Sequence, residues 1–560
     1  MSPQTASIHV FPSHRQNEIN RHIYSGFTEH MGRCIEGGIY DPNNPNKDLL
    51  TPKSLRKDVI STLKPLDIPI FRYPGGNFTA TYHWQDGVGP VDQRPTRLNL
   101  AWGGQPETNS FGTNEFMAWC RDHMNAEPYL CLNMGTGTLD EALAWIEYCN
   151  ATGDSYYAKL RREHTGHDRP HNVKYWGLGN EVWGPWQIAQ TKDPKLYAET
   201  ALQWAKAIKL LDPSVKLILC GSDGMQSVSL PFEPIPFVPP SMIQAASASM
   251  SDALHNTFQL ERLRTLCPRI SRAWDYEVIK ATILPATTSD LGVTQGPLID
   301  YVSIHGYTAS QTHYPNVFAP LSAERAIETT TALIDLACAA NNIPPGQPRP
   351  TIAFDEWNVW DPKRAVGSQG AEEKYTLSDA LAVAVWLNVF VRQSDKVGMA
   401  CLAQSVNVIS PLMTTETGLI KQTSWFVYEL FCRFVRGHKV DVVVNCGCYQ
   451  GDTSPAWLRD SVKGREMRWL DVSASVDGEG WCVVCVVNAH EGEDIVTAVG
   501  GVDGGTEVEV YEVNGKSVDV TNMDGEEKVG ICEKRWVVQG EYVFPAHSFT
   551  MLRFRVSERK

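Results

Sequence analysis

The sequence predicts an α/β protein built on a (β/α)8 (TIM) barrel, followed by an all-β domain. Three observations support this prediction: eight short apolar segments that end in polar residues, helix-like stretches between most of them, and a Val-rich region after about residue 439. The length of 560 residues agrees, because it exceeds what one hydrophobic core usually supports.

The eight apolar segments are interpreted as the barrel strands. They are apolar at successive positions, a pattern typical of parallel strands that are buried on both faces. Polar residues close each segment, and in a (β/α)8 barrel these carboxyl ends form the rim of the active site. In chain order the segments are 22–30, 68–77, 128–137, 173–181, 216–224, 301–307, 351–357 and 399–407.

Helical periodicity accompanies most of the predicted strands, and repeated strand–helix units indicate a parallel sheet. Between the fifth and sixth strands, residues 225–297 are less regular. We expect an elaborated loop there, with a helix over 252–267, that lines the active site or a subunit contact. The predicted barrel helices are 54–66, 114–124, 139–150, 196–212, 324–342, 377–395 and 422–438.

The Val-rich C-terminal region consists of short strands bounded by Gly, Asp and Asn turns, which is typical of a β-sandwich, here jelly-roll-like. The stretch "ASIHVFP" near the N-terminus has the same character and precedes the barrel. We expect it to join the sandwich. The predicted domains are therefore a barrel of residues 18–438 and a sandwich of residues 1–17 plus 439–560.

Composition argues against several classes of partner. The net charge of −14 and the lack of a basic run argue against nucleic-acid binding. No apolar stretch of about 18 residues occurs and the N-terminus lacks a signal-peptide core, so we expect a cytoplasmic protein without a membrane partner. The fourteen cysteines lie mostly inside apolar runs, as buried free thiols do in a reducing compartment.

No metal or cofactor is expected. Cys446 and Cys448 form the closest cysteine pair, but no second pair or nearby histidine completes a zinc site. His164, His167 and His171 lie in a stretch rich in loop formers, where packing is the favoured interpretation. The glycines of "YPGGNF" lack the spacing of a nucleotide-binding loop.

Two glutamates lie at strand ends among aromatic residues: Glu181 in "WGLGNEVWGPWQ" and Glu356 in "AFDEWNVW". They fall on the fourth and seventh predicted strands, which places them opposite each other across the barrel mouth. Glycoside hydrolysis uses two such carboxyl groups: one protonates the leaving oxygen, and the other attacks the anomeric carbon or activates water. The alternative is that both glutamates are charged rim residues whose hydrogen bonds serve only the structure.

The surroundings favour the catalytic interpretation. Asn180 offers an amide that can hydrogen-bond a sugar hydroxyl, and His305 and Tyr307 lie at another strand end. Aromatic faces pack well on the C–H faces of sugars. The tryptophans near these rims are Trp102, Trp176, Trp183, Trp186, Trp357 and Trp360.

The ordered motifs "FRYPGGNF", "WGLGNEVWGPWQ", "SIHGY" and "FDEWNVW" resemble the α-L-arabinofuranosidases of glycoside hydrolase family 51. The resemblance runs from about Ile23 to Asn407. It implies a retaining enzyme with a (β/α)8 barrel and a β-sandwich to which the N-terminus contributes. It also implies arabinofuranosyl-containing oligosaccharides and polysaccharides, such as arabinan and arabinoxylan, as substrates, and assembly into a homo-oligomer.

The resemblance makes Glu181 the general acid/base and Glu356 the nucleophile. We expect burial and the neighbouring negative charge to raise the pKa of Glu181, and the two carboxyl groups to lie about 5–5.5 Å apart. His305 and Trp183, at the rims, are further candidate sugar contacts. The sugar contacts that the resemblance implies are Glu29, Asn77, Asn180, Tyr307 and Gln404.

Two alternatives remain open at this point. One is a barrel glycosidase of other specificity, such as an endo-β-1,4-glucanase or a β-xylosidase, because the core chemistry is the same. The other is a non-catalytic carbohydrate-binding protein, which would need a broken catalytic pair, whereas both glutamates are present. The natural substrate and the linkage preference stay open as well.

Overall fold

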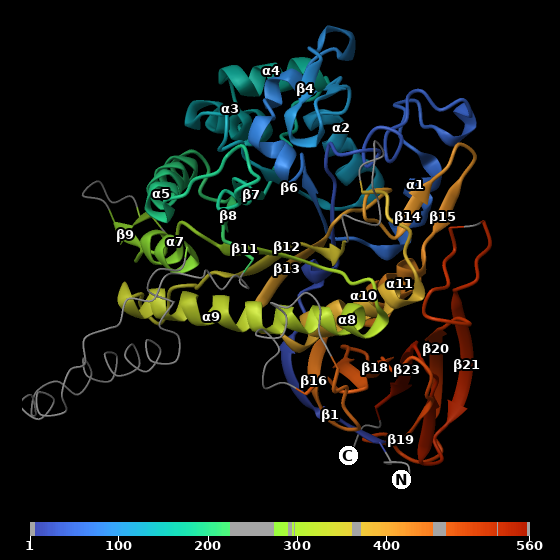
Figure 1. Cartoon of the computed structure of the whole chain (residues 1–560). Coiled ribbons are helices and arrows are strands. Elements are labelled where there is room, and N and C mark those ends of the chain that lie inside the picture. The colour runs from blue at the N-terminus through green and yellow to red at the C-terminus, as the bar shows by residue number, and fades with distance from the viewer. Residues whose placement is uncertain are drawn as a thin grey trace, which may run out of the picture.

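The computed structural model describes residues 6–223, 274–288, 294–295, 297–360, 371–451, 466–523 and 525–556. A closed barrel with its surrounding helices lies beside a sheet domain that holds both ends of the described chain (Figure 1). The predicted helix over 252–267 lies outside the described residues. The part of the 225–297 segment that is described contains α7 (Trp274–Thr282), which packs between α5 and α9.

Eight parallel strands form the barrel, and the last one pairs with the first to close it. Each predicted strand segment overlaps one of them in the expected order, so the barrel prediction is confirmed. The strands are β2 (Ser25–Phe27), β3 (Ile70–Tyr73), β6 (Glu127–Cys131), β7 (Tyr175–Leu178), β8 (Lys216–Cys220), β11 (Tyr301–Thr308), β12 (Thr351–Val359) and β13 (Val397–Leu402).

Helices cover the outside of the barrel. Local signals set where they begin: Asp193 caps α5 with Pro194 as its first residue, and Thr376 with Asp379 forms a capping box at α10. The helices are α1 (Lys57–Leu63), α2 (Thr113–Ala118), α3 (Leu139–Asn150), α4 (Tyr156–Thr165), α5 (Pro194–Leu211), α7, α8 (His313–Phe318), α9 (Ser322–Ala340), α10 (Leu377–Arg392) and α11 (Thr423–Phe434).

Helices α4, α7 and α8 were not predicted from the sequence. His164, which we expected in a loop, lies in the last turn of α4. This helix buries only Ala158 and Arg161, so its sequence lacks the apolar stripe that would reveal it. His167 and His171 follow the helix in irregular structure.

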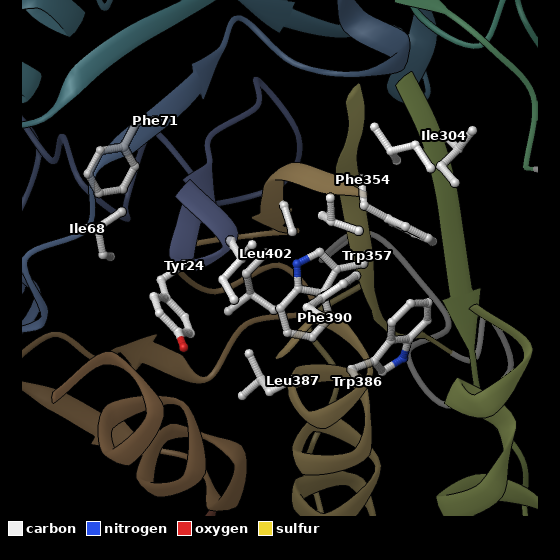
Figure 2. Close-up of a cluster of buried hydrophobic side chains, with 14 of the residues drawn as sticks. Tyr24, Ile68, Phe71, Ile304, Phe354, Trp357, Trp386, Leu387, Phe390 and Leu402 are labelled. Carbon is white, nitrogen blue, oxygen red and sulfur yellow. The ribbon is translucent and has the colours of Figure 1, made fainter. Parts of the chain in front are cut away.

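The core between the barrel and α10 is aromatic (Figure 2). Trp357 of β12 packs against Phe390 with ring centroids 5.1 Å apart, and against Trp386 at 5.7 Å. Such tilted and edge-on pairs add to the free energy gained by burying the rings. The side of β12 that faces α10 is therefore firmly packed, and this fixes the strand that carries Glu356.

The C-terminal domain is one nine-stranded sheet in the order β21-β20-β23-β18-β17-β16-β1-β19-β22. It curls until its end strands meet, since Trp536 of β21 and Tyr542 of β22 lie 5.0 Å apart. The strands are β1 (Ala6–Glu18), β16 (His438–Asn445), β17 (Leu470–Val476), β18 (Trp481–Asn488), β19 (Ile495–Gly500), β20 (Glu507–Val513), β21 (Ile531–Val537), β22 (Glu541–Phe544) and β23 (Ser548–Arg555).

The N-terminal strand β1 joins this sheet as expected, antiparallel to β16 and parallel to β19. The sheet is anchored to α10, where Asn388 donates a 2.7 Å hydrogen bond to Asp471 and Arg392 forms an ion pair with the same carboxylate. The domain boundaries at residues 17 and 438 stay predictions. No described helix combines the length and apolar character needed to cross a bilayer.

Candidate active site

Glu181 and Glu356 come together at the carboxyl ends of the barrel strands. Glu356 lies on β12 beside His305 of β11, and Glu181 follows β7. One carboxylate oxygen of each glutamate and a ring nitrogen of His305 all lie within 4.8 Å of one another. In retaining glycosidases the two carboxyl groups lie about 5–5.5 Å apart, and in inverting ones about 6.5–9.5 Å apart. The short distance between Glu181 and Glu356 fits the retaining class better.

Glu181 is held by three hydrogen bonds. Its Oε1 lies 3.0 Å from Nδ1 of His305, and its Oε2 accepts from Nε1 of Trp186 (3.0 Å) and Nε2 of Gln187 (2.8 Å). The backbone of Glu181 is left-handed, with φ of 42°, which is uncommon for a residue with a side chain. Such conformations cluster at functional sites, where the surrounding structure enforces them.

The predicted rise in the pKa of Glu181 is wrong for the unliganded site. Burial does act to raise it, but the hydrogen bond to His305 and the positive charge of that ring outweigh burial. The donors Trp186 and Gln187 add to this effect. The pKa of Glu181 is therefore held below its ordinary value, and the carboxylate is ionised.

Glu356 is oriented on both of its oxygens. Arg72 donates from Nη1 to Oε1 at 2.6 Å, and the hydroxyl of Tyr307 donates to Oε2 at 2.8 Å. Nδ1 of His305 lies 3.6 Å from Oε2. These contacts fix the orientation of the carboxylate, as nucleophilic attack on a bound sugar requires.

His305 lies among three carboxylates. Burial acts to lower its pKa, but the charges of Glu356, Asp355 and Glu181 raise it to about 10. Asp355 is itself held by the hydroxyls of Ser303 (2.5 Å) and Tyr129 (2.7 Å). His305 is therefore an imidazolium that balances the negative charge of the site.

Among the described residues, Glu181, His305 and Glu356 are the one group of three side chains close enough to share a metal ion. An imidazolium has no free lone pair for a metal. We therefore do not identify His305 as a metal ligand, and the expectation that the protein needs no metal stays a prediction.

Asn180 presents a free amide group beside the candidate nucleophile. Its Oδ1 accepts a 2.6 Å hydrogen bond from Arg72, whereas its buried Nδ2 has no partner among the described residues. A Cβ on Gly76 would lie 2.7 Å from Oε1 of Glu356 and 3.4 Å from Nδ2 of Asn180. Both groups thus border the same small space, which only glycine leaves open.

Glu29 and Gln404, two of the predicted sugar contacts, bind each other. Nε2 of Gln404 donates to Glu29 at 2.9 Å, and the amide of Glu29 donates back at 3.1 Å. The other oxygen of Glu29 accepts from the amide of Phe78 and from Nε1 of Trp102, both at 3.0 Å. Burial, followed by the charge of Glu356, raises the pKa of Glu29 to about 7.

The two remaining predicted contacts lie on the side of Glu181. Asn77 accepts a hydrogen bond from Gln187, which also donates to Glu181. Trp183 packs edge-on against Trp186, with centroids 5.1 Å apart, and its indole N–H is buried without a partner among the described residues. Trp183 is less exposed than Trp186 but donates no hydrogen bond to either carboxylate, so Trp186 is the tryptophan that holds Glu181.

Most predicted site residues thus belong to one network of hydrogen bonds and ion pairs. The role of each residue in function stays a prediction. The sequence analysis did not assign Arg72, Asp355 or Gln187 to the site. Arg72 lies near the end of β3, Asp355 directly precedes Glu356 in β12, and Gln187 closes the motif "GNEVWGPWQ", so nearness to the rim motifs was the available signal. Arg72 and its partner Asn180 are 108 positions apart in the chain, a separation that no local pattern reveals.

Comparison with known proteins agrees with this architecture. Residues 62–258 match the family model described as "Alpha-L-arabinofuranosidase 1 domain". Residues 355–548 match the one described as "Alpha-L-arabinofuranosidase C-terminal domain". The first model falls within the barrel, and the second covers the end of the barrel and most of the sheet domain.

The chain is similar over its whole length to curated relatives. It is 56% identical to a "Probable alpha-L-arabinofuranosidase C" of Aspergillus fumigatus, over 99% of this chain and 98% of that protein. It is 33% identical to the "Intracellular exo-alpha-(1->5)-L-arabinofuranosidase" of Halalkalibacterium halodurans, over 88% and 86%.

A solved structure shares the fold. The thermostable GH51 α-L-arabinofuranosidase of Thermotoga petrophila superposes with a TM-score of 0.77 at 32% identity, and the match covers 98% of this chain and 100% of that one. Together with the barrel and the sheet domain, these matches show that the chain belongs to the α-L-arabinofuranosidases of glycoside hydrolase family 51.

Proposed function

We propose that the protein is a retaining α-L-arabinofuranosidase that releases terminal, non-reducing arabinofuranosyl residues from oligosaccharides and polysaccharides such as arabinan and arabinoxylan. The observation that carries the proposal is the pair Glu181 and Glu356, with carboxylate oxygens within 4.8 Å and separate sets of hydrogen-bond partners. The name of the Halalkalibacterium relative, an exo-α-(1→5)-L-arabinofuranosidase, supports the exo mode of action.

In the first step, Glu356 attacks the anomeric carbon. Its Oε1 is held by Arg72 and its Oε2 by Tyr307, so the attacking carboxylate needs no reorientation. The bond between the anomeric carbon and the leaving oxygen breaks while the ester bond to Glu356 forms. The leaving oxygen takes a proton from Glu181, which leaves a covalent arabinosyl-enzyme.

His305 supplies the proton that Glu181 needs. In the unliganded site this proton resides on the imidazolium, 3.0 Å from Oε1 of Glu181. When the ester forms, Glu356 loses its negative charge, and one reason for His305 to stay charged disappears. Transfer of the proton from His305 to Glu181, and on to the leaving oxygen, then keeps the charge of the site balanced.

In the second step, Glu181 is an anion again, takes a proton from the attacking water and returns it to His305 across their 3.0 Å contact. The water oxygen bonds to the anomeric carbon, the ester to Glu356 breaks, and the configuration at that carbon is restored. The donors Trp186 and Gln187 hold Glu181 in its anionic form, which suits this base role.

The sugar is recognised by side chains that surround the pair. Nδ2 of Asn180 has no partner among the described residues and borders Glu356, so it donates to the sugar hydroxyl next to the anomeric carbon. That bond strengthens in the transition state. The other proposed contacts are Glu29, Asn77, Tyr307, Gln404, His305 and Trp183.

The test compares rates on nitrophenyl α-L-arabinofuranoside, nitrophenyl β-D-xyloside and a soluble β-1,4-glucan. We expect turnover of the arabinofuranoside with retained configuration in the first product, observed by NMR. A clear preference for the xyloside or the glucan would favour the alternative specificity, and inverted product would contradict the mechanism. Binding of arabinose without turnover of any substrate would favour a binding protein.

We also propose a homo-oligomer and an intracellular location. Family resemblance supports the first, and the printed name of the Halalkalibacterium relative supports the second. Light scattering on the purified protein tests the first, and a single-chain mass would contradict it. Cell fractionation tests the second, and native enzyme in the culture medium would contradict it.

A further inference from the structure

Asp275, in the first turn of α7, is a buried carboxylate that the proposed mechanism does not use. It accepts two hydrogen bonds of 2.7 Å from Ser222, one from the backbone N–H to Oδ1 and one from the hydroxyl to Oδ2. Burial raises the pKa of Asp275, and these two bonds oppose the rise. Both oxygens of the carboxylate thus bind one residue, and they tie Ser222 to the start of α7.

Ser222 in turn supports the backbone of His305. It lies just beyond β8, where the amide of Gly221 donates to the carbonyl of Ser303 at 2.9 Å. The amide of His305 donates to the carbonyl of Ser222 at 3.4 Å. On the other side of β11, the pairing with β12 shifts register between Ser303 and His305. The backbone at His305 therefore depends on the support that comes from the end of β8.

Trp274, the residue before Asp275, makes a second contact with the strand ends. Its ring stacks on that of Tyr197 in α5, with centroids 5.9 Å apart. The hydroxyl of Tyr197 donates to the carbonyl of Leu178 at 2.7 Å and accepts from the amide of Cys220 at 2.9 Å. Leu178 is the last residue of β7, and Cys220 is the last of β8. The first turn of α7, which packs against α5 (Figure 1), is thus tied to the ends of both strands.

The contact that depends on this support joins His305 to the general acid/base. Nδ1 of His305 lies 3.0 Å from Oε1 of Glu181, and a hydrogen bond weakens steeply when its geometry is lost. In the proposed mechanism the proton for the leaving oxygen crosses this contact. A small shift of the His305 backbone would therefore weaken acid catalysis. Attack by Glu356 would suffer less, because Arg72 and Tyr307 hold that carboxylate.

We propose that Asp275 is a positioning residue of the reaction, which acts through Ser222 to keep His305 in contact with Glu181. The inference rests on the proposed function and adds a residue to it. Asp275 takes no part in the bonds that form and break. Its loss should weaken the delivery of the proton to the leaving oxygen more than the attack on the anomeric carbon.

The test measures kcat/KM of the full-length protein on two arabinofuranosides that differ in their need for an acid. Nitrophenoxide leaves without a proton, whereas the methoxy group of methyl α-L-arabinofuranoside must be protonated as it leaves. The ratio of kcat/KM on the nitrophenyl glycoside to kcat/KM on the methyl glycoside is the leaving-group ratio. It rises when acid catalysis is weakened.

Three variants change the link between α7 and β8. Asp275→Ala removes both acceptors, and Ser222→Ala removes one of the two donors. Asp275→Asn is the conservative variant, because its amide oxygen can accept from the amide of Ser222 and its amide nitrogen can donate to the hydroxyl.

The matched control is Asp300→Ala, at the opposite end of the same pair of strands. Asp300 directly precedes β11 and accepts from the amide of Leu217 in β8 at 3.0 Å. It also forms ion pairs with Lys209 and Lys216. Its loss therefore removes a similar carboxylate clamp far along the strands from the catalytic groups. Thermal unfolding of each variant shows whether the fold is kept.

We expect the leaving-group ratio to rise about tenfold in Asp275→Ala, which is part of the roughly 10²–10⁴-fold that general acid catalysis supplies. The rise is smaller in Ser222→Ala, and Asp275→Asn restores the ratio towards the native value. Asp300→Ala leaves the ratio at the native value even where it lowers the melting temperature.

An unchanged ratio in both Asp275→Ala and Ser222→Ala would overturn the positioning role. An equal rise in Asp300→Ala would also overturn it, because any loosening of these strands would then have the same effect. Inactivity of the native protein on both glycosides would instead refute the proposed function.

Discussion

His305 and Glu181 share a hydrogen bond of 3.0 Å between Nδ1 and Oε1 at the carboxyl ends of the barrel strands. This contact joins a cation to the general acid/base of the proposed mechanism. It keeps Glu181 ionised in the unliganded site, and it places a proton within reach of the same carboxylate. The acid/base residue therefore needs no high pKa of its own, because the pair with His305 holds the proton.

The donors to Oε2 of Glu181 should set the pH dependence of turnover. Trp186→Phe keeps the ring but removes the N–H that donates at 3.0 Å. That bond helps to lower the pKa of Glu181, so its loss should raise this pKa.

The measurement is the pH profile of kcat/KM on nitrophenyl α-L-arabinofuranoside. The limb that reports Glu181 should move to higher pH in Trp186→Phe and stay in place in Trp536→Phe, a substitution in the sheet domain. Identical profiles for Trp186→Phe and the native protein would show that this bond does not tune the acid/base.

Gly76 should be required for its small size. A Cβ there would lie 2.7 Å from Oε1 of Glu356, so an added methyl group would displace the carboxylate of the nucleophile. Displacing the nucleophile by a fraction of an ångström to an ångström costs about 10²-fold in rate.

We therefore expect Gly76→Ala to reduce kcat by about 10²-fold while its melting temperature stays close to that of the native protein. The matched control is Gly346→Ala, where the added methyl would meet no atom within 4 Å. Native-like kcat in Gly76→Ala would mean that the nucleophile is not held against this glycine.

Glu29 should make stability depend on pH. Burial, followed by the charge of Glu356, raises its folded-state pKa from 4.5 to about 7. The folded protein then binds more protons than the unfolded chain between these values, so the contribution of Glu29 is full below pH 4.5 and is lost as pH rises through 7.

Glu29→Gln removes this dependence. The free energy of unfolding of the native protein, relative to Glu29→Gln, should fall by on the order of 3 kcal/mol from about pH 4.5 to above pH 7. Urea unfolding of both proteins across this range measures it. A difference that does not vary with pH would contradict the raised pKa.

The sequence was sufficient to predict the parts of the fold that repeat. Barrel strands are apolar on both faces and end in polar residues, so Glu181 and Glu356 could be placed at the rim from position alone. Helix α4 was missed because its exposed surface carries no apolar stripe. The curled nine-stranded sheet depends on pairings between distant strands, which composition does not specify.

The electrostatics of the site could not be predicted in the same way. Burial and a second carboxylate suggested a raised pKa for Glu181, but His305 lies 124 positions away and reverses the direction. Asp355 shows the same limit: it precedes Glu356 in the chain, yet its effect comes through His305. Such effects depend on distances of a few ångström between side chains on different strands.

The central claim is that Glu356 becomes covalently bonded to the sugar while Glu181 moves the proton. The most direct test treats the variant Glu181→Gln with nitrophenyl α-L-arabinofuranoside, whose leaving group needs no acid, and maps the adduct by peptide mass spectrometry. We predict that one anhydropentose accumulates on the peptide that contains Glu356, at that residue. An adduct on another residue would contradict the account. So would the absence of any adduct if Glu356→Ala also turned over the substrate as fast as the native protein.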